Sequence, residues 1–194
     1  MTTVYFVRHA QPNYKNHDDL QRELTQKGLE DRKLVTEYLC EKGIDVVLSS
    51  PFKRAVQTVA HFAEKNDLPI LTVSDFRERK VESGWIEDFE DFCRRQWEDF
   101  SYKRFDGESL EEVQRRNVQA LNKVLEDYPE KTIVIGSHGT ALSTIINFYD
   151  PGFGYAEFQR IRNLMPWIVI FRFEGKNCLE IQEYDVFEKT TDKR

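Results

Sequence analysis

Short apolar runs of strand length alternate along the chain with amphipathic stretches of helical period. The apolar runs cover residues 4–7, 45–48, 69–73, 132–135, 167–173 and 179–184. The helical stretches cover residues 25–40, 51–63, 109–125 and 140–148. Because strands and helices alternate in this order, we expect an α/β fold: one domain over residues 1–194, built as a three-layer α/β/α sandwich with a mostly parallel central sheet.

Polar residues mark the beginnings of three of these helices. Thr25 and Ser109 are suited to cap the helices that follow them, and Glu112 completes a capping box with Ser109. The pair Ser50-Pro51 predicts a helix whose first turn begins at the proline. The last residues, 188–194, carry no such pattern, and we expect them to fray.

Charged and polar residues directly follow four of the predicted strands. In chain order they are Arg8 and His9, then Arg54, then Glu78, and finally His138 with Gly139 and Thr140. Because the carboxyl ends of parallel strands meet at one edge of a sheet, we expect these residues to converge there. A single histidine beside a strand is usually structural, so the case for a site depends on all of them occurring together.

A bound anion would explain this set of residues. Arg54 falls in the first turn of a helix, where the positive end of the helix dipole disfavours a cation unless an anion lies nearby. The helix starts near Ser50 and Gly139 offer free backbone amides, and arginine offers paired donors. Phosphate is the ligand that these groups fit best.

Composition narrows the class of protein. The 194 residues carry 28 Lys and Arg against 34 Asp and Glu, a formal net charge of −6. This charge argues against a general binder of nucleic acids or anionic membranes, and no apolar run approaches the roughly 18 residues of a transmembrane helix. Cys40, Cys93 and Cys178 are odd in number and widely spaced, which favours a reducing, cytoplasmic location over a disulfide framework.

Several of these residues lie in motifs that, taken in order, resemble the histidine phosphatase superfamily with its phosphoglycerate-mutase-like fold. The matching segments are VYFVRHA (4–10), LTQKG (24–28), LSSPFKRAVQT (48–58), FRE (76–78), GES (107–109) and IGSHGT (135–140). The Arg-His pair alone is a weak signal. The motifs in this order across residues 4–148 are specific.

The resemblance implies a role for each residue of the set. His9 would be the nucleophile that takes the phosphoryl group, and Glu78 would donate a proton to the leaving group. The groups implied to bind the phosphoryl oxygens are Arg8, Arg54, the catalytic His138, Gly139 and Thr140. The chemistry agrees, because a neutral imidazole is a competent nucleophile and arginines can neutralise phosphoryl oxygens without a metal. The sequence holds no metal-ligand motif, so we expect neither a metal nor a cofactor.

The loop of residues 10–23 departs from the family pattern. Ala10 stands where the family usually has glycine, and Pro12 and Lys15 replace a small hydroxyl residue and an asparagine near the phosphate. Lys15, Asn13 or Asn16 could supply the missing phosphate contact, or the loop could supply none. Because of these departures, a second class of function stays open: the protein could be a catalytically weak relative that only binds phosphorylated ligands.

Residues 75–112 form an acidic and aromatic segment, with 13 acidic and 7 basic side chains. Helical spacing is shown by Phe89, Phe92, Cys93, Trp97 and Phe100. We expect a helical cap insertion over about 75–107. The helix could pack onto the body, or cover the pocket with an aromatic wall that includes Trp85 and Trp97, or do both. An acidic cap would disfavour substrates with several phosphates.

The sequence therefore predicts a metal-independent phosphomonoesterase that acts on a small phosphorylated metabolite through a phosphohistidine intermediate. A phosphoglycerate-mutase-type phosphotransferase is the main enzymatic alternative, although mutases of this family are generally longer. A phosphatase for phosphohistidine on proteins is a further alternative, typically shorter and without a cap. No nucleic-acid or membrane partner is expected, and the sequence does not indicate an oligomeric partner.

Overall fold

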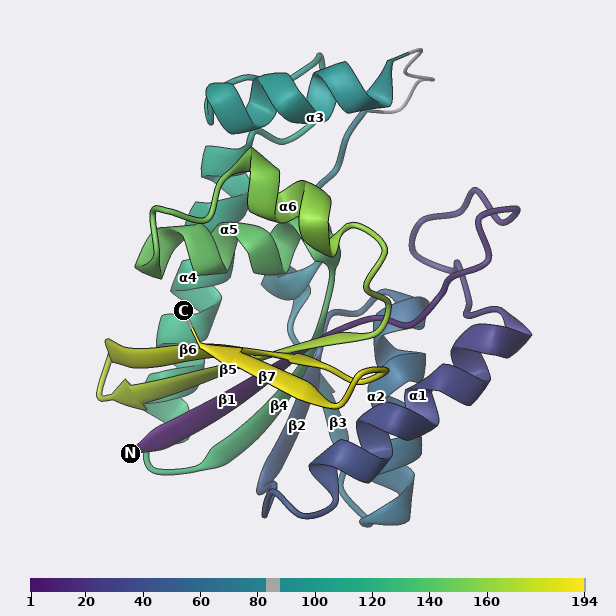
Figure 1. Ribbon diagram of the computed structural model, residues 1–194, viewed down its shortest axis with the longest axis vertical. Coiled ribbons are helices and arrows are strands. Elements are labelled where there is room, and N and C mark those ends of the chain that lie inside the picture. The colour runs from purple at the N-terminus through teal and green to yellow at the C-terminus, as the bar shows by residue number, and fades with distance from the viewer. Residues whose placement is uncertain (83–87, 194) are drawn as a thin grey trace.

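A mixed β-sheet forms the centre of the molecule in the computed structural model, which describes residues 1–82 and 88–193 (Figure 1). Within these residues the sheet has seven strands in the order β3-β2-β4-β1-β5-β6-β7. The strands are β1 (Thr2–Arg8), β2 (Val46–Ser49), β3 (Ile70–Thr72), β4 (Thr132–Ser137), β5 (Trp167–Glu174), β6 (Asn177–Asp185) and β7 (Thr190–Lys193). The predicted α/β fold with a central sheet is confirmed.

The sheet has a parallel half and an antiparallel half. Strands β3, β2, β4 and β1 are parallel, as the alternation of strands and helices predicted, whereas β5, β6 and β7 continue the sheet in antiparallel pairs. The parallel register pairs Arg8 with Ser137 and Ser49 with Gly136. The residues that follow these strands therefore emerge side by side at one edge.

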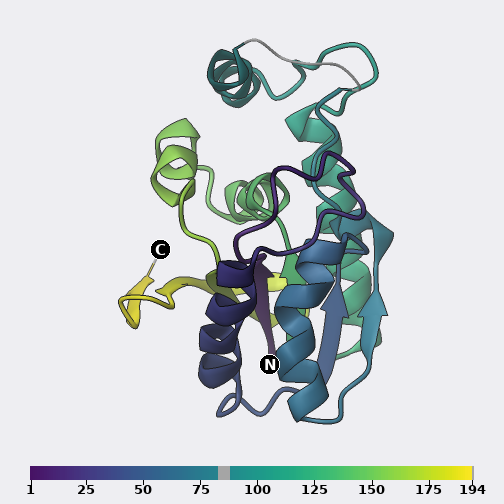
Figure 2. The ribbon, with the colours of Figure 1, turned by 90° about the vertical axis from the view of Figure 1, so that its right-hand side faces the viewer.

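Helices cover both faces of the sheet. They are α1 (Gln26–Leu39), α2 (Lys53–Lys65), α3 (Phe89–Glu98), α4 (Leu110–Asp127), α5 (Gly139–Tyr149) and α6 (Tyr155–Ile161), with a short 3-10 helix η1 (Ser74–Phe76). Alternation along β1 divides the core between the faces. Val4 and Phe6 pack with α4 and α5, whereas Tyr5 and Val7 pack with α1 and α2. Figures 1 and 2 show these helices on opposite sides of the strands.

Two of the three predicted helix starts are confirmed. Thr25 accepts a hydrogen bond from the Gly28 amide, and Ser109 and Glu112 form a capping box. The third prediction was wrong, since α2 begins at Lys53 and not at the proline before it. The hydroxyl that was expected to cap this helix, on Ser50, instead bonds a histidine and the amide at position 52.

The C-terminal region differs from the sequence expectation. Residues 188–194 were expected to fray, but Thr190–Lys193 form β7, which pairs with β6. The sequence pattern also gave no sign of α6, a short helix between α5 and β5. Both elements are short, and their stability comes from strand pairing and packing that local periodicity does not report.

The predicted helix of the inserted segment is α3, which lies beyond α5 and α6 (Figures 1 and 2). Its buried face packs onto α6. The Trp97 ring lies 5.5 Å from the Phe158 ring and 6.0 Å from the Phe153 ring, measured between centroids. Trp97 therefore belongs to the core and not to a pocket wall. Trp85, the other tryptophan expected in that wall, lies outside the described residues.

Candidate active site

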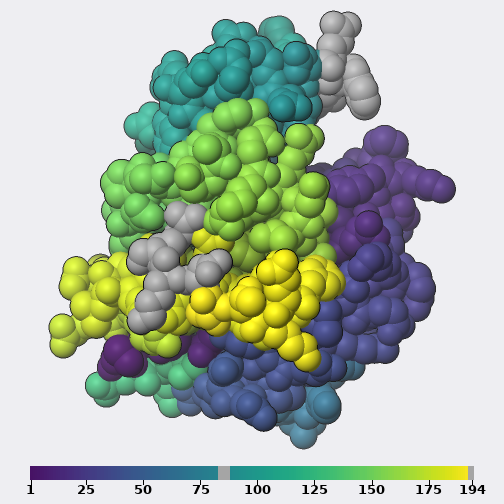
Figure 3. Space-filling model, in the orientation of Figure 1, coloured from purple at the N-terminus to yellow at the C-terminus, as the bar shows by residue number. Residues whose placement is uncertain are grey.

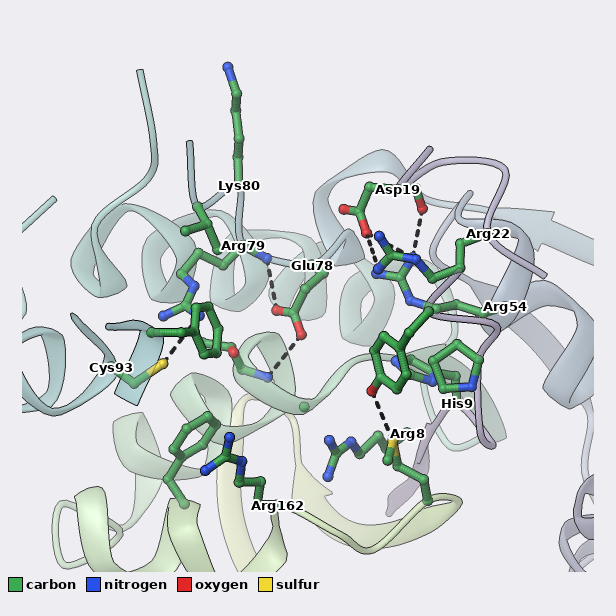
Figure 4. A pocket seen from close by; sticks show the side chains of 18 of the residues that line it. Arg8, His9, Asp19, Arg22, Arg54, Glu78, Arg79, Lys80, Cys93 and Arg162 are labelled. Atoms are coloured by element: carbon green, nitrogen blue, oxygen red, sulfur yellow. Dashed lines mark hydrogen bonds and ion pairs between the residues drawn. The ribbon is translucent and has the colours of Figure 1, made fainter. Parts of the chain in front are cut away.

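Four of the predicted residues come together at the carboxyl edge of the parallel strands. We call Arg8, His9, Arg54 and His138 the cationic ring. The two imidazole rings lie 5.3 Å apart between centroids and meet edge to face. Both arginines lie close enough to act on the charge of His9 and His138, and Figure 4 shows Arg8, His9 and Arg54 grouped at one end of a pocket.

Arg8 is held in place by the backbone. Its Nη1 donates hydrogen bonds to the carbonyl oxygens of Ile161 and Leu164, at 2.7 and 3.2 Å. Its Nε is buried and has no partner among the described residues. A Cβ atom at Gly139 would lie 3.0 Å from the guanidinium, so a glycine here lets Arg8 pack against the start of α5. The site thus holds a buried guanidinium whose Nε–H is available to donate a hydrogen bond to a ligand.

His9 is oriented as a nucleophile. Its Nδ1 lies 2.8 Å from the Ala10 carbonyl oxygen, which can only accept a hydrogen bond, so the ring proton lies on Nδ1 and Nε2 keeps its lone pair. Burial, followed by the charges of Arg54 and Arg8, holds the pKa of His9 well below its ordinary value. His9 is therefore neutral at physiological pH, which is the form that attacks phosphorus.

His138 lies behind His9 and is fully buried. Its Nε2 lies 2.7 Å from the Ser50 hydroxyl oxygen, and the Phe52 ring packs edge-on against it at 5.2 Å. Burial is the main cause that keeps the pKa of His138 well below its ordinary value, and Arg54 and His9 lower it further. The imidazole of His138 does not line the cavity in this conformation. Its Nδ1 is buried and has no partner among the described residues.

Arg54 is buried, and a carboxylate already contacts it. Its Nη1 donates to the Asp19 carbonyl oxygen at 2.6 Å and lies 3.1 Å from the Asp19 carboxylate. Arg22 donates to the same carboxylate at 3.0 Å. Burial lowers the pKa of Arg54, and the Asp19 charge raises it. Asp19 is half exposed, so an incoming anion can compete with it for Arg54 and Arg22.

Glu78 lies beside the start of α5. Its carboxylate accepts hydrogen bonds from the backbone amides of Thr140, Ala141 and Arg79, at 3.1, 3.1 and 2.8 Å. Thr140 therefore offers its amide to a carboxylate here, at the positive end of the helix dipole. This is an anion-binding position next to the ring.

The GES motif at residues 107–109 holds the chain segment that carries Glu78 in place. Glu108 accepts hydrogen bonds from Arg116 at 2.8 and 2.9 Å. Arg116 in turn donates to the backbone carbonyl oxygens of residues 75, 77 and 78. The GES motif thus acts through Arg116 to fix the position of Glu78.

A cavity of about 810 Å³ joins these groups to the inserted segment. Six of the residues that the sequence predicted for the site line this cavity: Arg8, His9, Arg54, Glu78, Gly139 and Thr140. The described lining does not include Asn13, Lys15 or Asn16, the loop residues that could have supplied a phosphate contact. Asn13 donates its side-chain amide to Glu23 instead, so it closes the loop on itself. Figure 3 shows this loop, in purple, across a notch from α3 and α6.

The far side of the cavity is a second cluster, of which the helical spacing in the sequence indicated only Phe89 and Cys93. We call Arg79, Phe89, Cys93, Phe158 and Arg162 the distal wall. Arg79 is 4% exposed, donates to Gln96 and to the Cys93 sulfur, and lies over the rings of Phe89 and Phe92. The part of the aromatic wall that the structure describes is therefore Phe89 and Phe158.

The acidic charge of the insertion does not dominate the cavity. From the described part of the insertion, Glu78, Glu82 and Glu90 line the cavity against Arg79 and Lys80, and Arg162 from outside the insertion adds a cation. Asp91 and Glu98 of α3 are instead paired with Arg94 on the exposed surface. The effect of the cap on substrates with several phosphates therefore stays a prediction.

Asp19, Arg22, Arg79 and Arg162 were not singled out from the sequence. Arg79 was the easiest to find, since it directly follows Glu78. Among residues 1–82 and 88–193, no three His, Cys, Asp or Glu side chains are grouped to hold a metal ion. In the same part of the chain, no helix combines the length and apolar character of a membrane span.

Comparisons with known proteins identify the family and the fold. The family model described as histidine phosphatase superfamily (branch 1) matches residues 4–184. The uncharacterized phosphatase PhoE of Bacillus subtilis (strain 168) is 29% identical over 167 residues, covering 84% of this chain and 85% of that protein. Phosphoserine phosphatase 1 of Hydrogenobacter thermophilus is 28% identical over 152 residues, 71% of each protein. The structure of Bacillus stearothermophilus YhfR has the same fold, with a TM-score of 0.75 at 20% identity, over 92% of this chain and 95% of that one.

Proposed function

Because this chain belongs to the histidine phosphatase superfamily (branch 1), we propose that it is a metal-independent phosphomonoesterase that acts through a phosphohistidine at His9. The observation that carries the proposal is the state of this imidazole. Its Nδ1 is bonded to a carbonyl oxygen, its Nε2 has no hydrogen-bond partner among the described residues, and burial among arginines keeps it neutral. A neutral nucleophile next to buried guanidinium groups fits a dianionic phosphate ester.

In the first step, His9 Nε2 forms a bond to phosphorus as the bond from phosphorus to the ester oxygen breaks. Arg8 and Arg54 neutralise the phosphoryl oxygens, and the ester oxygen leaves with a proton from Glu78. In the second step, Glu78 takes a proton from water, and the water oxygen displaces His9 from phosphorus. Inorganic phosphate leaves, and Glu78 is protonated again for the next turnover.

The distal wall supports a finer proposal about the substrate. Arg79 is buried and lines the cavity, and its guanidinium donates to an amide oxygen and a sulfur, with no carboxylate among its hydrogen-bond partners in the described residues. A buried guanidinium of this kind favours a ligand with a second anionic group. One relative is named a phosphoserine phosphatase, and phosphoserine carries a carboxylate. We therefore propose a small phosphorylated carboxylic acid as the substrate.

The test is phosphate release from a panel of phosphorylated metabolites, with esters that carry a carboxylate compared with esters that do not. Rapid alkaline quenching with labelled substrate should trap phosphate on His9, because phosphohistidine survives base. Full activity after exhaustive chelation is expected, and its loss would contradict metal independence. Isomerised phosphoester formed faster than free phosphate would instead identify a phosphotransferase, and binding without turnover would identify a phospho-ligand-binding protein.

A further inference from the structure

A buried serine at the end of β2 contacts the second histidine of the cationic ring. The Ser50 hydroxyl oxygen lies 2.7 Å from His138 Nε2, and both side chains are fully buried. Ser50 follows Ser49, which is paired with Gly136 of β4, so the sheet register brings Ser50 next to the residue that follows β4. The contact is therefore fixed by strand pairing and not by a flexible loop.

The hydrogen atoms at this contact can be counted. A serine hydroxyl has one proton to donate and two lone pairs that accept. The amide of Phe52 donates to Ser50 Oγ at 3.3 Å and uses one lone pair. Among the described residues, the only other group bonded to this oxygen is His138 Nε2. The hydroxyl proton therefore has no acceptor except Nε2, and a buried hydroxyl without an acceptor is unfavourable.

This count assigns the tautomer of His138. When Ser50 donates to Nε2, the single ring proton of a neutral His138 lies on Nδ1. That atom is buried and has no partner among the described residues. The charged and titratable groups around it are Arg54 on α2, Arg8 and His9 after β1, and Arg116 on α4. An N–H donor without an acceptor, on an imidazole with three arginines around it, is suited to bind an anion.

We infer that Ser50 is a positioning residue that holds His138 with its proton on Nδ1, so that this nitrogen donates to an oxygen of the bound phosphoryl group. The identity of that oxygen rests on the proposed function; the tautomer does not. His138 then offers a hydrogen bond while it is neutral. Without the Ser50 hydroxyl, the proton could move to Nε2, and the lone pair on Nδ1 would repel the phosphoryl oxygens.

The first experiment reads the tautomer directly in the wild-type protein. Nuclear magnetic resonance of histidine rings labelled with the heavy nitrogen isotope separates protonated from unprotonated ring nitrogens. The expected result is a protonated Nδ1 on His138 in the free protein, with a signal that moves when vanadate is added. A proton on Nε2, or a His138 signal that vanadate leaves unchanged, would overturn the inference. Spectra of His9→Gln, His17→Gln and His61→Gln assign the other three histidine rings.

The second experiment uses two neighbouring buried serines as a matched pair. Ser50→Ala should weaken vanadate binding about ten-fold at neutral pH, because a buried hydrogen bond is lost. The difference from wild type should narrow in acid, where a protonated His138 donates from both nitrogens. Ser49→Ala is the control, since the Ser49 hydroxyl donates to the Ser50 carbonyl oxygen and not to His138. Equal losses in both variants, or no loss in a folded Ser50→Ala, would contradict the inference.

The two proposals fail in different ways. If the protein releases no phosphate from any ester but His138 carries its proton on Nδ1 and responds to vanadate, the proposed function fails and the role of Ser50 stands. If phosphate is released and trapped on His9 while the His138 proton lies on Nε2, the role of Ser50 fails and the proposed function stands.

Discussion

The cationic ring and the distal wall lie at two ends of one cavity, with Glu78 between them, but they are built in different ways (Figure 4). Ring residues follow parallel strands whose register sets their spacing. The wall comes from the segment after η1, from α3 and from α6, which are held together by aromatic packing and by the contacts of Arg79.

The two regions also differ in how their charges are balanced. In the ring, Arg8 is bonded to backbone carbonyls and His9 to the Ala10 carbonyl, so both keep a fixed direction. In the wall, Arg79 bonds to side chains of α3, and Arg162 lies 3.7 Å from Glu90 on the same helix. The ring is thus set by the sheet, whereas the wall depends on how α3 packs. We expect changes in the ring to affect turnover and changes in the wall to affect substrate choice.

The most severe change expected in the ring is His9→Ala. Loss of the nucleophile should reduce kcat by about 10⁴-fold or more, as is usual for covalent catalysis. Steady-state phosphate release and trapping of labelled phosphate both measure the effect. His61→Ala is the matched control, because His61 bonds to Thr36 on α1, away from the cavity. A His9→Ala variant with a tenth of wild-type activity would contradict the mechanism.

Glu78→Gln tests the group between the two regions. Loss of the general acid should lower kcat by about 10²- to 10⁴-fold for alkyl phosphates, whose leaving groups need a proton. Aryl phosphates have better leaving groups and should lose much less. Glu90→Gln changes a carboxylate that lines the cavity near the distal wall, and it should show no such dependence on the leaving group. Equal losses for alkyl and aryl esters in Glu78→Gln would exclude it as the acid.

Arg79→Gln asks whether the wall selects the substrate. We expect KM to rise about 10- to 100-fold for phosphate esters that carry a carboxylate, because a charge-assisted hydrogen bond is lost. The kcat on an aryl phosphate without a carboxylate should change little. Arg94→Gln on the exposed side of α3 is the control, since its partners are Asp91 and Glu98. If KM for both kinds of ester rises equally, Arg79 does not recognise a second anionic group.

The smallest expected effect is a pH dependence of the free energy of unfolding that is caused by His9 and His138. The pKa values of His9 and His138 are held well below normal, so the unfolded chain, with histidine pKa near 6.5, binds more protons below about pH 6.5. The free energy of unfolding should therefore fall as the pH drops below about 6.5, by up to about 1.4 kcal/mol per pH unit for each histidine. Urea unfolding at about pH 7.5 and 5.5 measures this slope.

Replacing His9 or His138 by glutamine should reduce that slope. A saturating anion such as vanadate should also reduce the slope, because it stabilises the protonated imidazoles in the folded state. If His138→Gln keeps the full wild-type slope, the buried imidazole is not the source of the acid sensitivity.

Local sequence patterns were sufficient for the elements that form by strong periodicity or clear capping. The strand at 132–135, the Ser109 capping box and the helix after Gly139 all follow from spacing and side-chain chemistry. The start of α2 was misplaced because the Ser50 hydroxyl bonds His138, 88 positions away. The strand at 190–193 was missed because its stability depends on pairing with β6.

The residues of the candidate site likewise fall into those that sequence patterns identified and those that only the tertiary structure revealed. His9, Arg54 and His138 were identified because each follows a strand that enters the parallel part of the sheet. Asp19 and Arg79 were not, since a loop and an insertion have no period that relates them to the sheet. Asn13 was one of the loop residues that could have replaced the family's phosphate contact, and its amide bonds Glu23 instead.

The sequence by itself determined the order of strands and helices, and with it the edge of the sheet where the histidines and arginines emerge. Tertiary structure alone decided which carbonyl orients His9, which hydroxyl meets His138 and which arginine faces the far end of the cavity. The physical reason is range: periodicity and capping act over a few residues, whereas the contacts of His138 with Ser50 and of Arg79 with Gln96 join side chains that only packing brings together. The bond of His9 to the neighbouring Ala10 carbonyl depends on a local backbone conformation that periodicity does not report.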